Sequence, residues 1–333
     1  MNLRKLLLNA TALSAVALSV SVANAADIAT PVLRRPVAAV PYYNWTGFYV
    51  GGHFGGGWGR SEFTQTACSG SRGLVCGPNH VRGALDDTTA GLAGSVGDVG
   101  SHQFSGALGG VQVGYNWQIG RFLVGIEGQF SWSKMKGDHQ NTTSSTNVTA
   151  ELTFDQLFQG TNSDRLFTEV KSLGTIAARL GLVSGAEGRT LLYAKGGAGY
   201  AKTDYTLDQQ FSAGRFSSFS TLNPLSPSSA SLNGDGAFTG SKTRWGPMAG
   251  VGLEFALFDG WTAKVEYEHL FLGTQSVALT GTQVFILQNR GVETIVTSGS
   301  AGGTRTFDVQ QDINVIKFGL NYRFGNYYAA PRS

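Results

Sequence analysis

The clearest pattern in the sequence is a strict alternation of apolar and polar residues close to the C-terminus. Between Ile316 and Phe324 every second residue is aliphatic or aromatic, and the residues between them are polar or glycine. A period of two places the two sets on opposite faces of a β-strand. One face is therefore predicted to be apolar, and the other to carry two cations and an amide. This second face consists of Lys317, Gly319, Asn321 and Arg323.

Similar alternation elsewhere predicts eight strands in all. They cover residues 46–58, 104–118, 121–133, 168–183, 189–203, 244–257, 261–273 and 311–324. Pro247 weakens the pattern at the start of the sixth segment, because proline cannot donate a ladder hydrogen bond. Aromatic residues gather near the segment ends, where the interfacial girdles of a membrane barrel belong. They are Trp117, Phe122, Trp132, Trp245, Trp261 and Phe324.

The connections between these segments alternate in length. Three are tight turns, at 119–120, 184–188 and 258–260, whereas the other four run to about thirty to forty-five residues and are rich in Ser, Thr, Asn, Gln and Gly. This alternation is typical of outer-membrane barrels whose termini lie in the periplasm. The sequence thus predicts an all-β fold, an eight-stranded antiparallel up-and-down transmembrane β-barrel with long extracellular loops and short periplasmic turns. A soluble β-sandwich or lipocalin is the alternative.

The N-terminus has the features of a cleaved secretory signal. Arg4 and Lys5 precede an uncharged run over 6–22, and Ala23-Asn-Ala25 offers small residues for cleavage between Ala25 and Ala26. An N-terminal helix or membrane anchor is the alternative. The predicted domains are therefore a signal peptide at 1–25, a Pro-rich periplasmic linker at 26–44, the barrel at 45–325 and a tail at 326–333. The linker is interpreted as solvated, with contact of Arg34-Arg35 to anionic headgroups or peptidoglycan as the alternative.

Composition agrees with a secreted membrane barrel. The chain has 47 Gly in 333 residues and 11% aromatic residues, but only 14% charged residues, compared with about 25% in soluble domains. The formal charge of +3 includes Arg4 and Lys5, so about +1 remains after cleavage. So small a charge argues against a nucleic-acid partner. After the signal no apolar run is long enough for a transmembrane helix.

Several short motifs resemble one known family. They are 44–52 (NWTGFYVGG), 109–117 (GGVQVGYNW), 193–200 (YAKGGAGY), 264–267 (KVEY) and 319–324 (GLNYRF). Together they resemble the small eight-stranded outer-membrane barrels of alphaproteobacteria, the surface-antigen group often labelled porin family. The resemblance implies location in the outer membrane of a Gram-negative cell and an envelope-integrity or host-contact role, sometimes with porin activity or haem binding.

The end of the last segment also resembles the C-terminal signal that the barrel assembly machinery recognises. The matching residues are Lys317, Gly319, Tyr322 and Phe324, although residues 325–333 follow them. The partners we expect are therefore this machinery, outer-membrane lipid and an extracellular partner reached through the loops.

The polar faces predict the content of the lumen. An eight-stranded barrel is barely wide enough for its own side chains, so four acids and five bases would have to neutralise one another there. We therefore predict a plugged lumen and a structural, loop-displaying protein, with a narrow passive porin or a surface barrel for a haem-type ligand as alternatives. The network would consist of Glu127, Arg179, Lys195, Glu254, Lys264, Glu266, Glu268, Lys317 and Arg323.

Two turns give specific register predictions. A two-residue turn at Ile119-Gly120 would place Gln112 opposite Glu127. A turn centred on Asp259 would place Glu254 across from Lys264, where the two are predicted to form an ion pair.

The remaining candidate chemistry is sparse. The five histidines are scattered, His269 has no adjacent Ser nucleophile, and Asn233-Gly-Asp235-Gly is interpreted as a loop turn; we predict no catalytic, cofactor or metal site. Cys68 and Cys76 in the first long loop are predicted to form a disulfide. Free thiols, or a metal site with His80, are the alternatives.

Overall fold

The structure is a computed structural model that describes residues 42–70, 97–152, 154–215, 229–290 and 294–326. Its strands are β1 (Gly47–Gly70), β2 (Gly97–Ile119), β3 (Phe122–Leu152), β4 (Phe154–Ser184), β5 (Thr190–Arg215), β6 (Ser229–Ala256), β7 (Trp261–Arg290) and β8 (Thr294–Arg323). Within these ranges no helix is long and apolar enough to cross a membrane.

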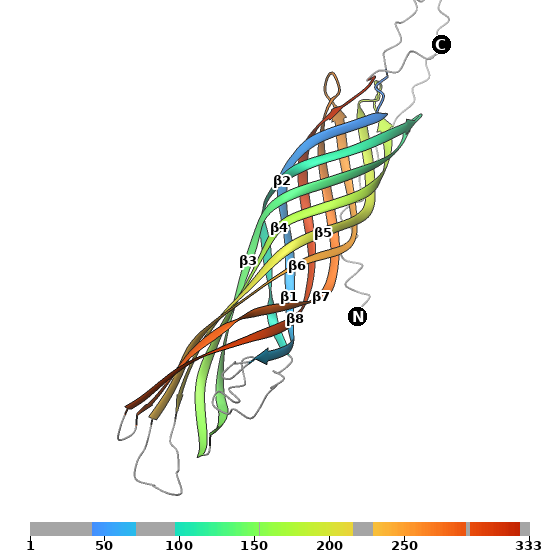
Figure 1. Cartoon of the computed structure of the whole chain (residues 1–333). Coiled ribbons are helices and arrows are strands. Elements are labelled where there is room, and N and C mark those ends of the chain that lie inside the picture. Colours follow the sequence, from blue (N-terminus) through green and yellow to red (C-terminus); the bar gives the residue numbers. More distant parts are fainter. Residues whose placement is uncertain (1–41, 71–96, 153, 216–228, 291–293, 327–333) are drawn as a thin grey trace, which may run out of the picture. The chain divides into compact units, whose positions relative to one another are not determined.

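The eight strands form one closed barrel in which every strand is antiparallel to its sequence neighbours (Figure 1). The ring closes through β1 and β8, whose ladder runs from Tyr49 opposite Arg323 to Gly70 opposite Gly303. Closure removes the free sheet edges that lipid could not hydrogen-bond. The predicted eight-stranded up-and-down barrel is confirmed.

The strands turn an apolar face outward and a polar face inward, which is the reverse of a soluble protein. On β8 the Lys317 side chain is 2% exposed, whereas its neighbour Phe318 is 48% exposed. The same alternation holds around the charged residues of the other strands, where Val, Ile, Leu, Phe and Trp lie outside and the charged residues lie inside. The exposed apolar belt on the outside of the barrel therefore excludes a soluble sandwich or lipocalin.

The β2–β3 register differs from the prediction by two residues. The turn consists of Gly120 and Arg121, so Gln112 lies opposite Gln129 and Glu127 lies opposite Gly114. Gly120 has a φ of 64°, a left-handed conformation that glycine adopts without strain. Because the offset is even, each residue keeps its predicted face.

The β6–β7 turn has the predicted register, with Glu254 opposite Lys264. Asp259 and Gly260 take left-handed φ values of 37° and 82° in the turn. Further along, the β6–β7 ladder is interrupted between Thr239 and Met248. Pro247, which cannot donate to the ladder, lies in this interruption.

The strands are much longer than predicted. β3 and β4 have 31 residues each and leave only residue 153 between them, and β7 and β8 have 30 residues each. About 9–11 residues suffice to span a bilayer. Much of the expected loop sequence therefore continues the strands beyond the membrane, including Asn233–Gly236, which lies in β6 and not in a loop turn.

The barrel interior is filled in successive layers. An apolar cluster at the periplasmic end contains Tyr43, Trp45, Leu123, Val183, Leu191, Tyr193 and Ala256. A layer of charged side chains follows, and then a larger apolar cluster that contains Phe104, Leu108, Met135, Val170, Leu173, Met248, Leu270, Ile313 and Val315. A third apolar cluster lies in the extension beyond the membrane and contains Phe63, Leu166, Leu207, Phe238, Leu279 and Phe307.

Candidate functional site

Eight buried charged side chains meet in the lumen at the level of the membrane. The alternation of each strand turns them inward, and they come from β3 to β8. We call these residues the charge cluster: Glu127, Arg179, Lys195, Glu254, Lys264, Glu266, Glu268 and Lys317. It holds four carboxylates and four cations, which together carry no net charge.

Glu127 on β3 lies at the centre of the cluster. Its carboxylate is 3.0 Å from Lys264 Nζ, 3.2 Å from Lys195 Nζ and 3.5 Å from Arg179 Nη1. The hydroxyl of Tyr49 also donates to it, at 2.7 Å. One carboxylate therefore joins cations from three strands.

Glu266 and Glu268 on β7 complete the outer part of the cluster. Glu266 accepts from Lys195 at 2.8 Å and from Lys264 at 3.2 Å. Glu268 binds Lys195 and Lys317, with 2.6 Å between its Oε2 and Lys317 Nζ. Each of these carboxylates contacts two amino groups, which offsets the cost of burying its charge.

Glu254 pairs with Arg179 and not with Lys264. Its Oε2 is 2.8 Å from Arg179 Nη2, and its other oxygen accepts from Asn321 at 2.8 Å. The predicted Glu254–Lys264 ion pair is therefore wrong, although the two residues are opposite each other in the ladder. In so narrow a lumen, side chains from non-adjacent strands come closer than register neighbours do.

Several polar residues of the site were not predicted. Tyr193 donates to Glu266 at 2.8 Å, and Gln129 donates to both Glu127 and Glu266. Tyr49 bonds to Arg179 at 2.6 Å as well as to Glu127. Strand parity could have identified Tyr49, since it alternates with the outward Phe48 and Val50.

The aromatic plug, which we define as Tyr43 and Trp45, fills the periplasmic end of the barrel. Trp45 is fully buried, and its indole Nε1 donates to the carbonyl of Gly188 at 2.8 Å. The backbone N–H of Tyr43 donates to the carbonyl of Glu187 at 2.8 Å. The last residues of the predicted linker thus belong to the barrel.

Arg323 occupies this end of the lumen too. Its guanidinium donates to the carbonyl of Thr46 at 2.7 Å and lies over the Tyr43 ring at 5.0 Å. The sequence placed Arg323 in the charge network; the structure places it beside the aromatic plug.

The C-terminal residues that resemble an assembly signal divide between the two faces. Lys317 and Gly319 face the lumen, where the nearest side chains to Gly319 are Gln112 and Lys264. Tyr322 and Phe324 lie on the other face of β8 with their rings 5.1 Å apart. Recognition by the assembly machinery stays a prediction.

Three of the described histidines pair with neutral groups. His53 lies 2.8 Å from Ser131 Oγ, His102 lies 2.9 Å from Thr168 Oγ1, and His269 lies 2.8 Å from Asn314 Oδ1. Burial, reinforced by His139, lowers the pKa of His102, in the extension beyond the membrane, to about 4. The described part of the chain contains no group of three or more His, Cys, Asp or Glu that could hold a metal ion.

Other predicted residues lie where the structure gives no test. Cys76, His80, the cleavage site at Ala25 and Ala26, and the tail from 327 are outside the described residues. Cys68 belongs to β1, but its side chain is not described. The disulfide and the signal peptide therefore stay predictions.

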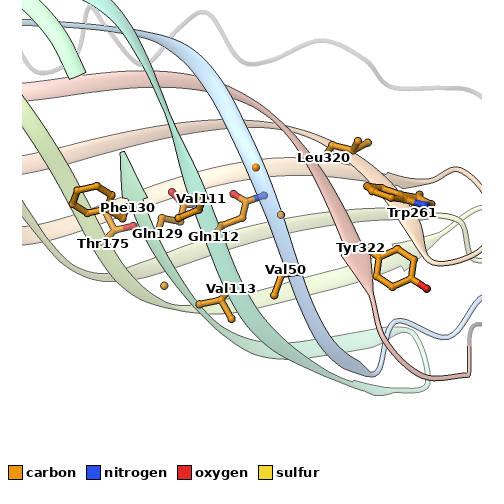
Figure 2. Close-up of a pocket in the computed structure, with 13 residues that line it drawn as sticks. Val50, Val111, Gln112, Val113, Gln129, Phe130, Thr175, Trp261, Leu320 and Tyr322 are labelled. Atoms are coloured by element: carbon orange, nitrogen blue, oxygen red, sulfur yellow. The ribbon is translucent and has the colours of Figure 1, made fainter. Parts of the chain in front are cut away.

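The hollow in Figure 2 is lined mainly by apolar residues, has a volume of about 890 Å³, and does not coincide with the charge cluster. Val50, Val111, Val113 and Leu320 belong to the outward-facing set. Such a lining offers van der Waals contact with lipid and few polar groups.

Comparison with known proteins agrees with this architecture. The sequence model of the family described as "Outer membrane protein beta-barrel domain" matches residues 11–324. The 31 kDa outer-membrane immunogenic proteins of Brucella melitensis and Brucella suis are each 26% identical to this chain over 313 residues, which is 93% of this chain and 97% of theirs.

Two solved structures resemble the chain only weakly. OprG from Pseudomonas aeruginosa is 11% identical, with a TM-score of 0.31 over 85% of this chain and 99% of its own. The attachment invasion locus protein Ail of Yersinia pestis is 11% identical, with a TM-score of 0.22 over 78% of this chain and 98% of its own. Scores this low support no detailed structural comparison.

Proposed function

This chain belongs to the outer membrane protein beta-barrel domain family, and from that premise we propose that it is a closed barrel that supports the envelope and displays its extracellular part. Its place in the outer membrane follows from the family and from the Brucella relatives. The proposal concerns what the barrel does there. It favours structural support and display over passive transport.

The observation that carries the proposal is the filling of the lumen. The aromatic plug, the charge cluster and the apolar cluster around Met135 and Leu270 follow one another along the barrel axis. A hydrated path would have to separate buried ion pairs and then wet an apolar layer, and both steps are costly.

Two further observations favour display. The strands extend far beyond the length that a bilayer requires, and an inward apolar cluster that includes Phe63 and Phe307 packs this extension. The Brucella relatives are described as immunogenic. We propose that this chain also presents its extension and loops to the outside of the cell.

Conductance of the purified barrel in planar bilayers tests the proposal. We expect no steady conductance from the intact protein. Lys264→Ala removes two contacts of the charge cluster, and Val265→Ala on the lipid side is the matched control. Conductance in Lys264→Ala alone would assign closure to the charge cluster. A steady, sizeable conductance in the intact protein would defeat the proposal and favour the narrow porin.

We also propose that the barrel is not an enzyme. Within the described ranges, the His53–Ser131 contact at 2.8 Å resembles a nucleophile and its base. Ser131 is buried in the lumen, and among the described residues His53 Nδ1 has no hydrogen-bond partner that would orient the ring. On incubation with ester and peptide substrates, we expect the intact protein to give no more turnover than the Ser131→Ala variant.

A further inference from the structure

The apolar band on the outside of the barrel ends at a girdle of aromatic residues. Trp132 on β3 and Trp245 on β6 are each 60% exposed, and the Tyr200 ring on β5 lies 5.0 Å from Trp245. Aromatic side chains of this kind mark the interface between hydrocarbon and headgroups. Residues next in line toward the extracellular side therefore face the headgroups of the outer leaflet.

Five exposed lysines occupy this level. They come from β3 to β6, four consecutive strands of the ring (Figure 1). Two follow Trp132 on β3, and one precedes Trp245 on β6. One precedes Ser172 on β4, and one follows Tyr200 on β5. We call them the lysine patch: Lys134, Lys136, Lys171, Lys202 and Lys242.

Carboxylates neutralise only part of this patch. Glu169 binds Lys136 at 3.0 Å and Lys171 at 2.7 Å, and Asp204 lies 4.0 Å from Lys171. The other three lysines have no carboxylate within ion-pair distance in the described part of the chain. Five lysines against two carboxylates leave three positive charges on one side of the barrel.

The opposite side of the barrel has a different character at the same level. β7 continues beyond Phe271 with Thr274 and Gln275, and β8 carries Gln310 and Asp312. On β1, Arg60 is paired with Glu62 at 3.1 Å. Among the described residues the excess of positive charge thus lies on β3–β6, which makes it a patch and not a general property of the rim.

We propose that the lysine patch binds the phosphate groups of lipid headgroups in the outer leaflet of the outer membrane. The amino groups of Lys134, Lys202 and Lys242, which have no carboxylate partner among the described residues, complement phosphate charge, and the girdle holds them at headgroup depth. A Lys near an anionic membrane surface contributes about 1 kcal/mol to its attraction. This inference rests on membrane location and not on closure of the lumen, so a conducting barrel would leave it intact.

Native mass spectrometry tests the inference with the mature chain folded in a neutral detergent. The probe is diphosphorylated lipid A, compared with the same lipid after removal of its phosphates. We expect the phosphorylated lipid to bind, and the triple variant Lys134→Gln, Lys202→Gln, Lys242→Gln to weaken binding by at least about tenfold. All three side chains are exposed, and heat-dependent gel mobility checks that the variant is folded.

Two further variants separate charge from other effects. The corresponding triple change to Arg keeps the charge and should retain binding. Arg121→Gln, at an exposed position of the β2–β3 turn on the periplasmic side, removes one charge away from the patch and should leave binding unchanged. Equal binding of the dephosphorylated lipid, or unchanged binding by the triple Gln variant, would overturn the inference. Displacement of the lipid by millimolar inorganic phosphate alone would also overturn it, because the site would then recognise free anions and not headgroups.

Discussion

Lys264 on β7 binds Glu127 on β3 with 3.0 Å between its Nζ and the carboxylate Oε2. In a closed ring of eight strands, β3 and β7 are diametrically opposed. The bond therefore crosses the full width of the lumen and ties together walls that share no backbone hydrogen bond. The stability of the barrel should therefore depend on this contact.

Removal of the central carboxylate should destabilise the barrel strongly. Glu127→Gln would leave Lys264, Lys195 and Arg179 with fewer anionic partners in a buried site. We expect a loss of roughly 3–5 kcal/mol in the free energy of unfolding, measured by denaturant titration in detergent. Glu62→Gln, at an exposed ion pair with Arg60, is the control and should change stability by less than about 1 kcal/mol. Equal effects of the two changes would contradict the central role of Glu127.

Two buried arginines should respond differently to the same change. Arg179 binds both Glu127 and Glu254. Arg244 donates to the carbonyls of Val309 and Gln275 and lies over the Tyr205 ring, but it has no carboxylate partner among the described residues. Arg179→Met would leave two carboxylates without this cation, but Arg244→Met would remove an uncompensated charge. We expect Arg179→Met to be the more destabilising by at least about 2 kcal/mol in denaturant titrations. Similar losses would show that Arg244 has a partner outside the described residues.

Strand parity accounts for most of what the sequence predicted correctly. Inward Lys317 and outward Phe318 follow from a period of two, and the same period held for every strand of the charge cluster. The β2–β3 register was harder to predict, because the two-residue turn could consist of residues 119–120 or of residues 120–121. An error of two residues leaves the faces unchanged, so the pattern itself could not reveal it.

The partners inside the lumen could not be predicted from the sequence, since they depend on the circumference of the ring and the stagger of its strands. Glu254 lies opposite Lys264 in the ladder but bonds to Arg179 on β4. The aromatic plug was missed for another reason. Tyr43 follows three prolines that indicate a linker, and only the closed barrel provides the cavity that Trp45 fills.

Trp45 should stabilise the periplasmic end of the barrel. Its ring is fully buried, stacks edge-on against Tyr43 at 5.0 Å and donates to Gly188. Trp45→Ala would leave a cavity and an unpaired carbonyl, and we expect it to cost about 3–5 kcal/mol of unfolding free energy. Trp132→Ala, on the lipid-facing side, is the matched control and should cost less. An equal loss would mean that burial of Trp45 inside the barrel stabilises the fold no more than burial of Trp132 in lipid.

Stability should fall in mild acid because of His102. Its folded-state pKa of about 4 is below its ordinary value of 6.5, so the unfolded chain binds the proton more readily. The contribution of neutral His102 is complete above pH 6.5 and is lost as the pH falls toward 4. We expect up to about 2 kcal/mol less unfolding free energy at pH 5 than at pH 7.5. His102→Gln should reduce this difference; an unchanged pH dependence would assign it to other groups.

A pair of double-mutant cycles on Lys264 can separate bonding across the lumen from pairing along the sheet. Lys264 contacts Glu127 at 3.0 Å but faces Glu254 only through strand register. Contacting residues couple by about 0.5–3 kcal/mol. We expect Glu127→Gln with Lys264→Met to show a coupling above about 1.5 kcal/mol. Glu254→Gln with Lys264→Met should show a coupling below about 0.5 kcal/mol, because Arg179 satisfies Glu254 in either background. The reverse order would mean that neighbouring strands pair their charges locally, and the two walls of the lumen would then not be tied together.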